Sequence, residues 1–121
     1  MNVSDLAKEL AKDKNVLAVL VFGSVATGKT KPMSDIDVAV MLSPYDINSA
    51  AFAEASSGRK LDVVVFNDLP PFIQFNVLKE GKILFCRDNA QFRQHALWAM
   101  KNYHFHLPLY EKFKAKVPAG A

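Results

Sequence analysis

Cysteine is nearly absent from this chain of 121 residues, because Cys86 is its single thiol. One cysteine can form neither an internal disulfide nor a cysteine-rich zinc site, which excludes disulfide-framed mini-proteins and zinc fingers. Long apolar runs are also missing: the longest covers seven residues, Val16 to Phe22, whereas a membrane-spanning helix needs about 20. The charged N-terminal region does not resemble a signal peptide. We therefore expect a cytoplasmic protein with no membrane partner.

Acidic residues are scarce toward the C-terminus, although the net charge of the whole chain is only +3. From Asn89 onward there are five basic residues and one acidic residue, Glu111. Such a basic end can meet phosphates or an acidic protein, or it can be a solvated helix face. Aromatic and basic residues do not interleave there as RNA-binding sheets require, so we do not expect a nucleic-acid partner.

Half of the residues are hydrophobic and 22% are charged, which is the composition of a globular domain. Short apolar, β-branched runs predict strands, and apolar residues three or four positions apart predict helices. The strands are expected at 16–22, 36–42, 61–66 and 83–86, and the helices near 5–14, 46–58, 70–81 and from 89 onward. This alternation predicts an α/β (α+β) fold in a single domain, 1–121, with a core of about 5–88 and a C-terminal helical extension of about 89–116.

Helix boundaries follow from local signals. Ser4 and Asp5 are plausible N-terminal residues of the first helix. Asp88 can cap the last helix, which Pro108 is expected to break or kink.

Gly23 and Ser24 follow directly after the first predicted strand. A glycine lets the backbone turn tightly and lets a phosphate approach closely. Backbone amides that open a helical turn can then donate to an anion, and the Ser24 hydroxyl can add to them or cap the turn. A glycine after a strand is also an ordinary turn residue, so this feature alone assigns no function.

Asp35 and Asp37 stand at the start of the second predicted strand. Because side chains alternate across a strand, both carboxylates share one face, with Cα atoms about 6.6 Å apart. At that distance they can hold one hard cation, and without a cation they repel each other. They can also be ordinary exposed carboxylates at a strand end.

Asp62 lies inside the apolar run of the third predicted strand, where we expect it to be buried. A buried carboxylate is costly unless it is paired or bound to a metal. Ion pairs with Arg59 or Lys60 are one explanation. If the second and third strands are neighbours, Asp62 instead completes a cluster of three carboxylates. Three carboxylates point to a nucleoside triphosphate and two metal ions about 3.5–4 Å apart.

The combination of Gly23-Ser24, a spaced Asp35-x-Asp37 and Asp62 in a later strand resembles the nucleotidyltransferases of the DNA polymerase β superfamily. The short length and the stretch from Gly23 to Val38 are most similar to the minimal nucleotidyltransferase (MNT) family. The resemblance covers about residues 5–85. It implies a small mixed sheet flanked by helices, with ATP as substrate and two Mg²⁺ ions as cofactors.

The resemblance also implies roles for individual residues. Asp35 and Asp37 would be metal ligands, and Asp62 would be the third ligand and the base for the incoming hydroxyl. Gly23 and Ser24 would hold the triphosphate. Many family members carry arginines near the positions of Thr27 and Met33, where this chain has none, and Lys29 and Lys31 are the substitutes.

Members of the MNT group often resemble antitoxins paired with a HEPN-domain toxin, and some transfer AMP to a tyrosine of that toxin. The resemblance therefore implies a protein adenylyltransferase with a HEPN-like partner, and the basic, aromatic C-terminal end is the candidate contact surface. Two alternatives stay open: an antitoxin that acts by binding alone, and transfer to a small molecule. Homo-oligomers also stay open.

Other residues carry weaker signals. His95, His104 and His106 lie in the last predicted helix without the neighbours of a zinc site, which favours surface or partner contacts. Trp98 is expected to anchor this helix on the sheet. Cys86 is expected to be an inert buried thiol.

Overall fold

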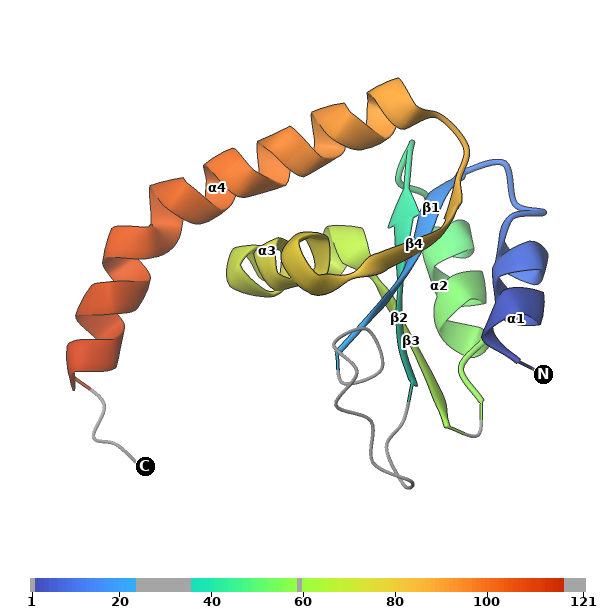
Figure 1. Ribbon diagram of the computed structural model, residues 1–121, viewed down its shortest axis with the longest axis horizontal. Helices are drawn as coiled ribbons and strands as arrows, with labels where there is room; N and C mark the ends of the chain where they lie inside the picture. The colour runs from blue at the N-terminus through green and yellow to red at the C-terminus, as the bar shows by residue number, and fades with distance from the viewer. Residues whose placement is uncertain (1, 24–35, 59, 117–121) are drawn as a thin grey trace.

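The computed structural model of this protein describes residues 2–23, 36–58 and 60–116 (Figure 1). Its elements are, in chain order, α1 (Val3–Leu10), β1 (Val16–Phe22), β2 (Ile36–Leu42), α2 (Ile47–Ala55), β3 (Leu61–Val65), the 3₁₀ turn η1 (Phe66–Asp68), α3 (Pro71–Glu80), β4 (Lys82–Cys86) and α4 (Asn89–Lys116). The expected strands 16–22 and 36–42 are present with the same bounds. The third ends one residue early, at Val65, because Phe66 opens η1.

The strands form one four-stranded mixed sheet in the order β3-β2-β1-β4. β1 is antiparallel to both of its neighbours, and β2 is parallel to β3. A parallel pair needs a crossover connection, which α2 supplies between β2 and β3. The expected mixed sheet flanked by helices is therefore confirmed.

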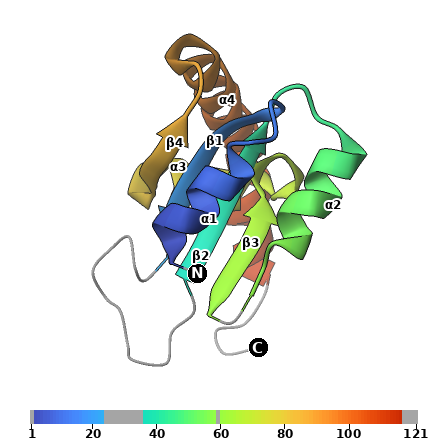
Figure 2. The same cartoon turned by 90° about the vertical axis from the view of Figure 1, so that its right-hand side faces the viewer.

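Helices cover both faces of the sheet: α1 and α2 lie on one face, and α3 and α4 lie on the other (Figures 1 and 2). Each face has its own apolar core. The first core joins residues such as Leu6 and Ala50 to alternate residues of the strands, and the second joins Val77 and Ala99 to the intervening ones. β1 is buried along nearly its whole length because it is central and covered on both faces, as its unbroken apolar run predicted.

The helix starts follow ordinary capping chemistry. The Asn2 side chain, and not Ser4 or Asp5 as expected, caps α1, because Asn2 Oδ1 accepts the Asp5 N–H at 2.8 Å. Asp46 caps α2, and the Asp88 carboxylate accepts two backbone N–H groups at the start of α4, as expected.

Of the two outcomes expected at Pro108, a break is not observed, because α4 continues through this residue to Lys116. A proline removes one helical hydrogen bond but leaves those of the neighbouring turns, so it kinks a helix more often than it ends one. Figure 1 shows the axis of α4 bending toward its C-terminal end. Within the described ranges, no helix is both long enough and apolar enough to cross a membrane.

Candidate active site

Asp37 and Asp62 lie side by side at one end of the sheet. They are register partners on the parallel strands β2 and β3, and Phe22 is the register partner of Asp37 on β1. The end of β1 and the starts of β2 and β3 therefore meet at the same end of the sheet. Because neighbouring strands lie about 4.8 Å apart, two carboxylates in register can reach one cation.

Both aspartates belong to the sheet face that α3 and α4 cover farther along the strands. Side chains alternate along a strand, so Asp37 shares a face with Ala39, and Asp62 shares a face with Val64. Ala39 and Val64 belong to the core beneath α3 and α4. Asp37 is half-buried and Asp62 is exposed, so the described helices leave the aspartate end of this face uncovered.

The expectation that Asp62 is buried was wrong. Leu61, Val63 and Val65 point into the core beneath α1 and α2, whereas Asp62 is exposed on the other face. β3 is an edge strand of the sheet, and the helices on that face do not cover its first residues. The Asp62 side chain therefore lies in water and does not bear the cost of burial. Among the described residues it makes no ion pair, Lys60 included, and Arg59 lies outside them.

Gly23 brings the backbone against the Asp37 carboxylate. Its φ is +78°, a left-handed conformation that side-chain-bearing residues adopt only with strain. A Cβ atom built on Gly23 would lie 2.5 Å from Asp37 Oδ2, which is too close for a non-bonded contact. A glycine is therefore required here both by the turn and by the space next to Asp37.

The remaining predicted site residues, Ser24, Lys29 and Asp35, lie outside the described residues, as do Lys31 and the positions Thr27 and Met33. The structure thus brings together Gly23, Asp37 and Asp62 and says nothing about the others. Within the part of the chain that is described, no group of three His, Cys, Asp or Glu residues could hold a metal ion. Two of the three carboxylates of the expected cluster belong to that part.

The donors present fit a hard cation. Carboxylate oxygens are the ligands that Mg²⁺ prefers, and one or two protein carboxylates together with substrate phosphates are its usual set. Asp37 and Asp62 supply two such carboxylates in register on one open face. A cation between them would also remove their mutual repulsion. The Asp37–Asp62 pair can thus bind a metal–phosphate substrate from solvent.

Each of the three histidines contacts a residue other than these aspartates. His95 Nε2 lies 3.2 Å from Ser43 Oγ, and His104 contacts the rings of Phe75 and Tyr103 edge-on. The His106 ring lies edge-on to Phe105.

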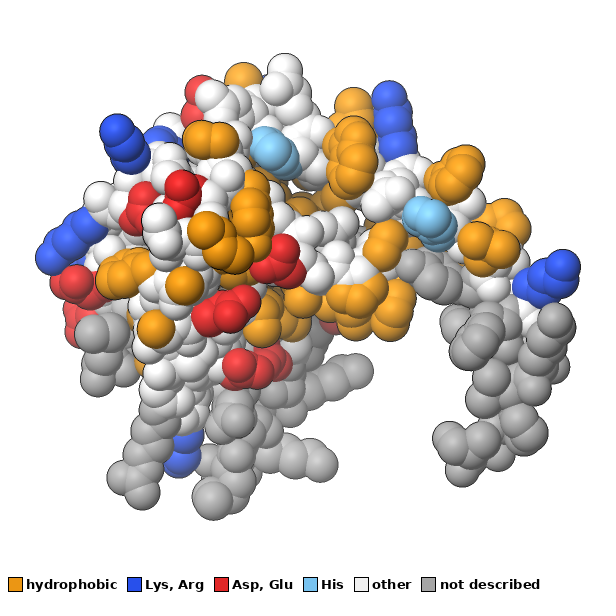
Figure 3. Space-filling view, turned by 180° about the vertical axis from the view of Figure 1, so that it is seen from behind, with side chains coloured by type: hydrophobic (Ala, Val, Ile, Leu, Met, Phe, Trp, Pro, Cys, Tyr) orange, Lys and Arg blue, Asp and Glu red, His pale blue; other side chains and the backbone are white. Residues whose placement is uncertain are grey.

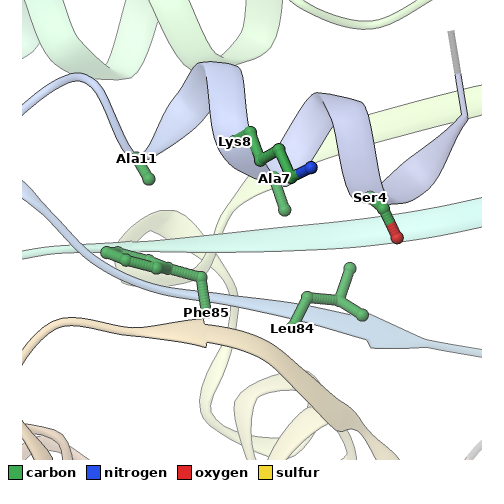
Figure 4. Close-up of a pocket in the computed structure, with 6 residues that line it drawn as sticks. All are labelled: Ser4, Ala7, Lys8, Ala11, Leu84 and Phe85. Carbon is green, nitrogen blue, oxygen red and sulfur yellow. The ribbon is translucent and has the colours of Figure 1, made fainter.

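A pocket of about 420 Å³ lies between α1 and β4, and it is separate from the aspartates. Its lining residues are Ser4, Ala7, Lys8, Ala11, Leu84 and Phe85 (Figure 4). α1 covers the face opposite to the one that carries Asp37 and Asp62, and β4 is the opposite edge strand. The pocket therefore does not belong to the candidate active site.

Sequence reasoning misjudged two residues outside the candidate site. Trp98 was expected to anchor α4 on the sheet, but 65% of it is exposed, because its neighbour Ala99 occupies the buried position of that helical turn. Cys86 is half-buried, not buried, because it lies near the end of the edge strand β4. The helical periodicity of α4 could have shown that Trp98 faces solvent, since residues that face the core recur every three or four positions.

Comparison with known proteins identifies the family. Residues 4–90 match the family described as "Polymerase beta, Nucleotidyltransferase". The chain belongs to this family. The match includes Gly23, Asp37 and Asp62 and ends where α4 begins, so the nucleotidyltransferase family is established for the core and not for most of α4.

Individual relatives agree with this assignment. A protein of Methanocaldococcus jannaschii named "Putative protein adenylyltransferase" is 29% identical over 80 residues, which are 66% of this chain and 63% of the relative. This chain therefore matches less than two thirds of the length of that relative.

Two solved structures resemble the fold over nearly the whole chain. One is a toxin–antitoxin pair with AMP-PNP, with 21% identity, a TM-score of 0.64 and 94% of each chain covered. The other is the tri-AMPylated HEPN toxin of Shewanella oneidensis in complex with its MNT antitoxin, with 19% identity, a TM-score of 0.60 and coverage of 93% and 90%. At these identities the likeness shows the fold alone.

Proposed function

We propose that this protein is a Mg²⁺-dependent nucleotidyltransferase that moves AMP from ATP to a hydroxyl of a partner protein, a tyrosine of a HEPN toxin. In this proposal it acts in the cytoplasm as the antitoxin of a toxin–antitoxin pair. The observation that carries the proposal is the register pairing of Asp37 with Asp62 at an open sheet end beside Gly23. The protein would be a single domain, whose core (5–88) performs the chemistry and whose residues 89–116 form a C-terminal helical extension.

The aspartates would hold the metal. Asp35, Asp37 and Asp62 would ligate two Mg²⁺ ions, which when bound neutralise the negative charge of the triphosphate. Gly23 itself adds no side chain next to the Asp37 carboxylate, where a Cβ atom would not fit. Ser24 and Lys29 would contact the phosphates, with Lys29 providing the positive charge that arginines provide in other members of the family.

The transfer step balances as a simple substitution at phosphorus. The acceptor hydroxyl oxygen forms a bond to the α-phosphorus of ATP, and the bond from that phosphorus to the bridging oxygen breaks, so pyrophosphate leaves. Asp62 accepts the hydroxyl proton. Its exposure suits this role, because an acceptor carried by another protein must reach it from solvent. Most of the acceleration then comes from positioning and electrostatics.

Three comparisons support this choice of substrate and partner. The archaeal relative carries the name of a protein adenylyltransferase. One structural neighbour is a toxin–antitoxin pair with an ATP analogue, and the other contains an AMPylated HEPN toxin bound to an MNT antitoxin. Transfer to a protein hydroxyl is therefore favoured over transfer to a small molecule.

The test is co-expression with a candidate HEPN toxin, followed by intact-mass measurement of that toxin with ATP and Mg²⁺ in excess. Each AMP should add about 329 Da, and Asp37→Asn should abolish this gain because it removes the charge of a metal ligand. Glu54→Gln is the matched control, because Glu54 is exposed on α2, on the opposite face. Peptide mapping should place the AMP on a tyrosine. A bound partner that shows no Asp37-dependent gain would overturn the enzymatic proposal in favour of an antitoxin that acts by contact.

A second measurement tests the metal directly. Mg²⁺ together with a non-hydrolysable ATP analogue should raise the melting temperature of the wild-type chain, and EDTA should reverse this rise. Asp62→Asn should remove most of the effect, whereas Glu54→Gln should keep it. An equal rise with and without Mg²⁺ would place the nucleotide away from the aspartates.

A further inference from the structure

Three large apolar side chains form an exposed stripe along α4. Trp98, Phe105 and Leu109 are exposed to 65%, 77% and 61%. They are seven and four residues apart, so at 3.6 residues per turn they fall within about 40° of one another around the helix. We call these three residues the α4 stripe. Single exposed apolar residues are common, but an aligned set with a tryptophan is typical of a contact surface.

The stripe is not needed to attach α4 to the body. The core-facing side of the helix is a different one: Ala99 is buried, and the Tyr103 ring stacks on Phe75 with ring centroids 4.2 Å apart. Figure 3 shows hydrophobic side chains at the surface along α4, close to Lys or Arg side chains. The helix therefore has one face bound to its own domain and another apolar face in solvent.

Positive charge borders the stripe. Lys101 follows Trp98 by three positions, and Lys112 follows Leu109 by three, which places each lysine next to a stripe residue. Both lysines are exposed. Glu111, the single acidic residue of α4, lies about 200° from Leu109 around the helix and thus away from the stripe.

This charge pattern disfavours a second copy of the chain as the occupant. Two copies that pair through their stripes would bring the lysines of both into the same interface, and like charges in close contact are destabilising. A surface with carboxylates would instead complement them. A ridge of aromatic and aliphatic residues on a helix fits the apolar groove between two helices of another protein.

We propose that the α4 stripe, with Lys101 and Lys112, is the docking surface for the acceptor protein. The complementary surface is an apolar groove between helices, with Asp or Glu residues along its rim. The identity of the partner as the HEPN protein rests on the proposed function. α4 is suited to this role because the family match ends at residue 90, so most of the helix lies outside the part shared by nucleotidyltransferases of many kinds.

The single tryptophan of the chain allows a direct test. Trp98 is the only tryptophan, so labelling with 5-fluorotryptophan gives one ¹⁹F signal, which reports on the stripe. Addition of the unlabelled, purified HEPN protein should shift this signal and reduce the solvent exposure of Trp98. The dissociation constant is measured in parallel, on variants whose folding is checked by circular dichroism.

The variants separate the apolar and the electrostatic contributions. Trp98→Ala should weaken binding by about 30-fold, as expected for a buried aromatic anchor. Lys101→Glu with Lys112→Glu should weaken it by about 10-fold, and this loss should shrink at high salt. The matched controls Met100→Ala and Arg93→Glu, on other sides of α4, should bind as wild type.

The possible results test the docking surface independently of the enzymatic function. Unchanged affinity in the stripe variants, or no binding of the HEPN protein to the wild-type chain, overturns the docking surface. A wild-type dimer in light scattering that dissociates with Trp98→Ala assigns the stripe to a second copy and also overturns it. Stripe-dependent binding without any AMP transfer supports the docking surface while the enzymatic proposal fails. AMP transfer together with unchanged affinities in the stripe variants supports the enzymatic proposal and overturns the docking surface.

Discussion

At the scale of single residues, the candidate site depends on the close approach of the Gly23 backbone to the Asp37 carboxylate. Gly23 has a positive φ and lies so close to Asp37 that no side chain fits between them. The glycine thus links the turn after β1 to the position of a carboxylate on β2. Asp62 stands in register on the other side of Asp37. The turn after β1 and the strands β2 and β3 therefore contribute one residue each to the same small volume.

Gly23→Ala should strongly lower the proposed AMP transfer while leaving the protein folded. The added methyl group would displace the Asp37 carboxylate, and a misplacement of about 1 Å at a reacting centre can cost about 100-fold in rate. The strain at positive φ should destabilise the fold by only about 1–2 kcal/mol. Rates are compared with those of Gly58→Ala, because a Cβ at Gly58 meets no atom within 4 Å. Equal rates for the two variants would contradict this role of Gly23.

At the scale of elements, a side chain extends the sheet where β2 ends. The side chain of Asn67 in η1 bonds to the backbone of Leu42 as a residue of a neighbouring strand would. Its Oδ1 accepts the Leu42 N–H, and its Nδ2 donates to the Leu42 carbonyl, both at 2.9 Å. Leu42 is fully buried, so its backbone groups have no access to water. The turn after β3 is thereby attached to the end of β2, which keeps the two parallel strands together at the end away from the aspartates.

Asn67→Ala should therefore destabilise the protein by about 2–3 kcal/mol, because it leaves a buried donor and a buried acceptor without partners. Chemical denaturation measures the loss as a lower midpoint with an unchanged slope. Asn48→Ala is the control, because Asn48 is exposed on α2 and should change the free energy of unfolding by less than about 0.5 kcal/mol. A similar small effect at Asn67 would show that the two hydrogen bonds do not contribute net stability.

At the scale of the whole molecule, only one of the two faces of the sheet carries the candidate site residues Asp37 and Asp62. α1 and α2 close one core and carry no predicted site residue. α3 and α4 close the other core but leave the aspartate end of that face open. α4 then continues past the sheet, and Pro108, Leu109 and Lys112 are exposed. The end of this helix contributes surface, whereas its first half contributes core.

A chain that stops after Leu107 should consequently keep its fold. Its melting temperature should stay within about 3 °C of the full chain, because Pro108, Leu109, Glu111 and Lys112, which it loses, are exposed. Binding of the proposed HEPN partner should weaken, because Leu109 of the α4 stripe and the adjacent Lys112 are gone. Differential scanning calorimetry and the ¹⁹F titration measure the two properties. A truncated chain that aggregates or melts much earlier would show that the end of α4 belongs to the fold.

The sequence alone determined the strands and the candidate chemistry. The β-branched, apolar run Val16 to Phe22 predicted a strand buried on both faces, and alternation placed the carboxylates of Asp35 and Asp37 on one face at a strand start. Local pattern also identified Gly23 as a turn residue. Each of these features is set by residues that are adjacent in the chain, so it can be predicted from the sequence.

The tertiary structure alone decided which residues meet and which face water. Nothing local says that β3 is an edge strand, so Asp62 was expected to be buried although it is exposed. The register of Asp62 with Asp37 depends on the parallel pairing across α2, and the exposure of Trp98 depends on which side of α4 packs on the body. Register and helix rotation are set by packing between distant segments, and a single sequence does not encode that packing in any local pattern.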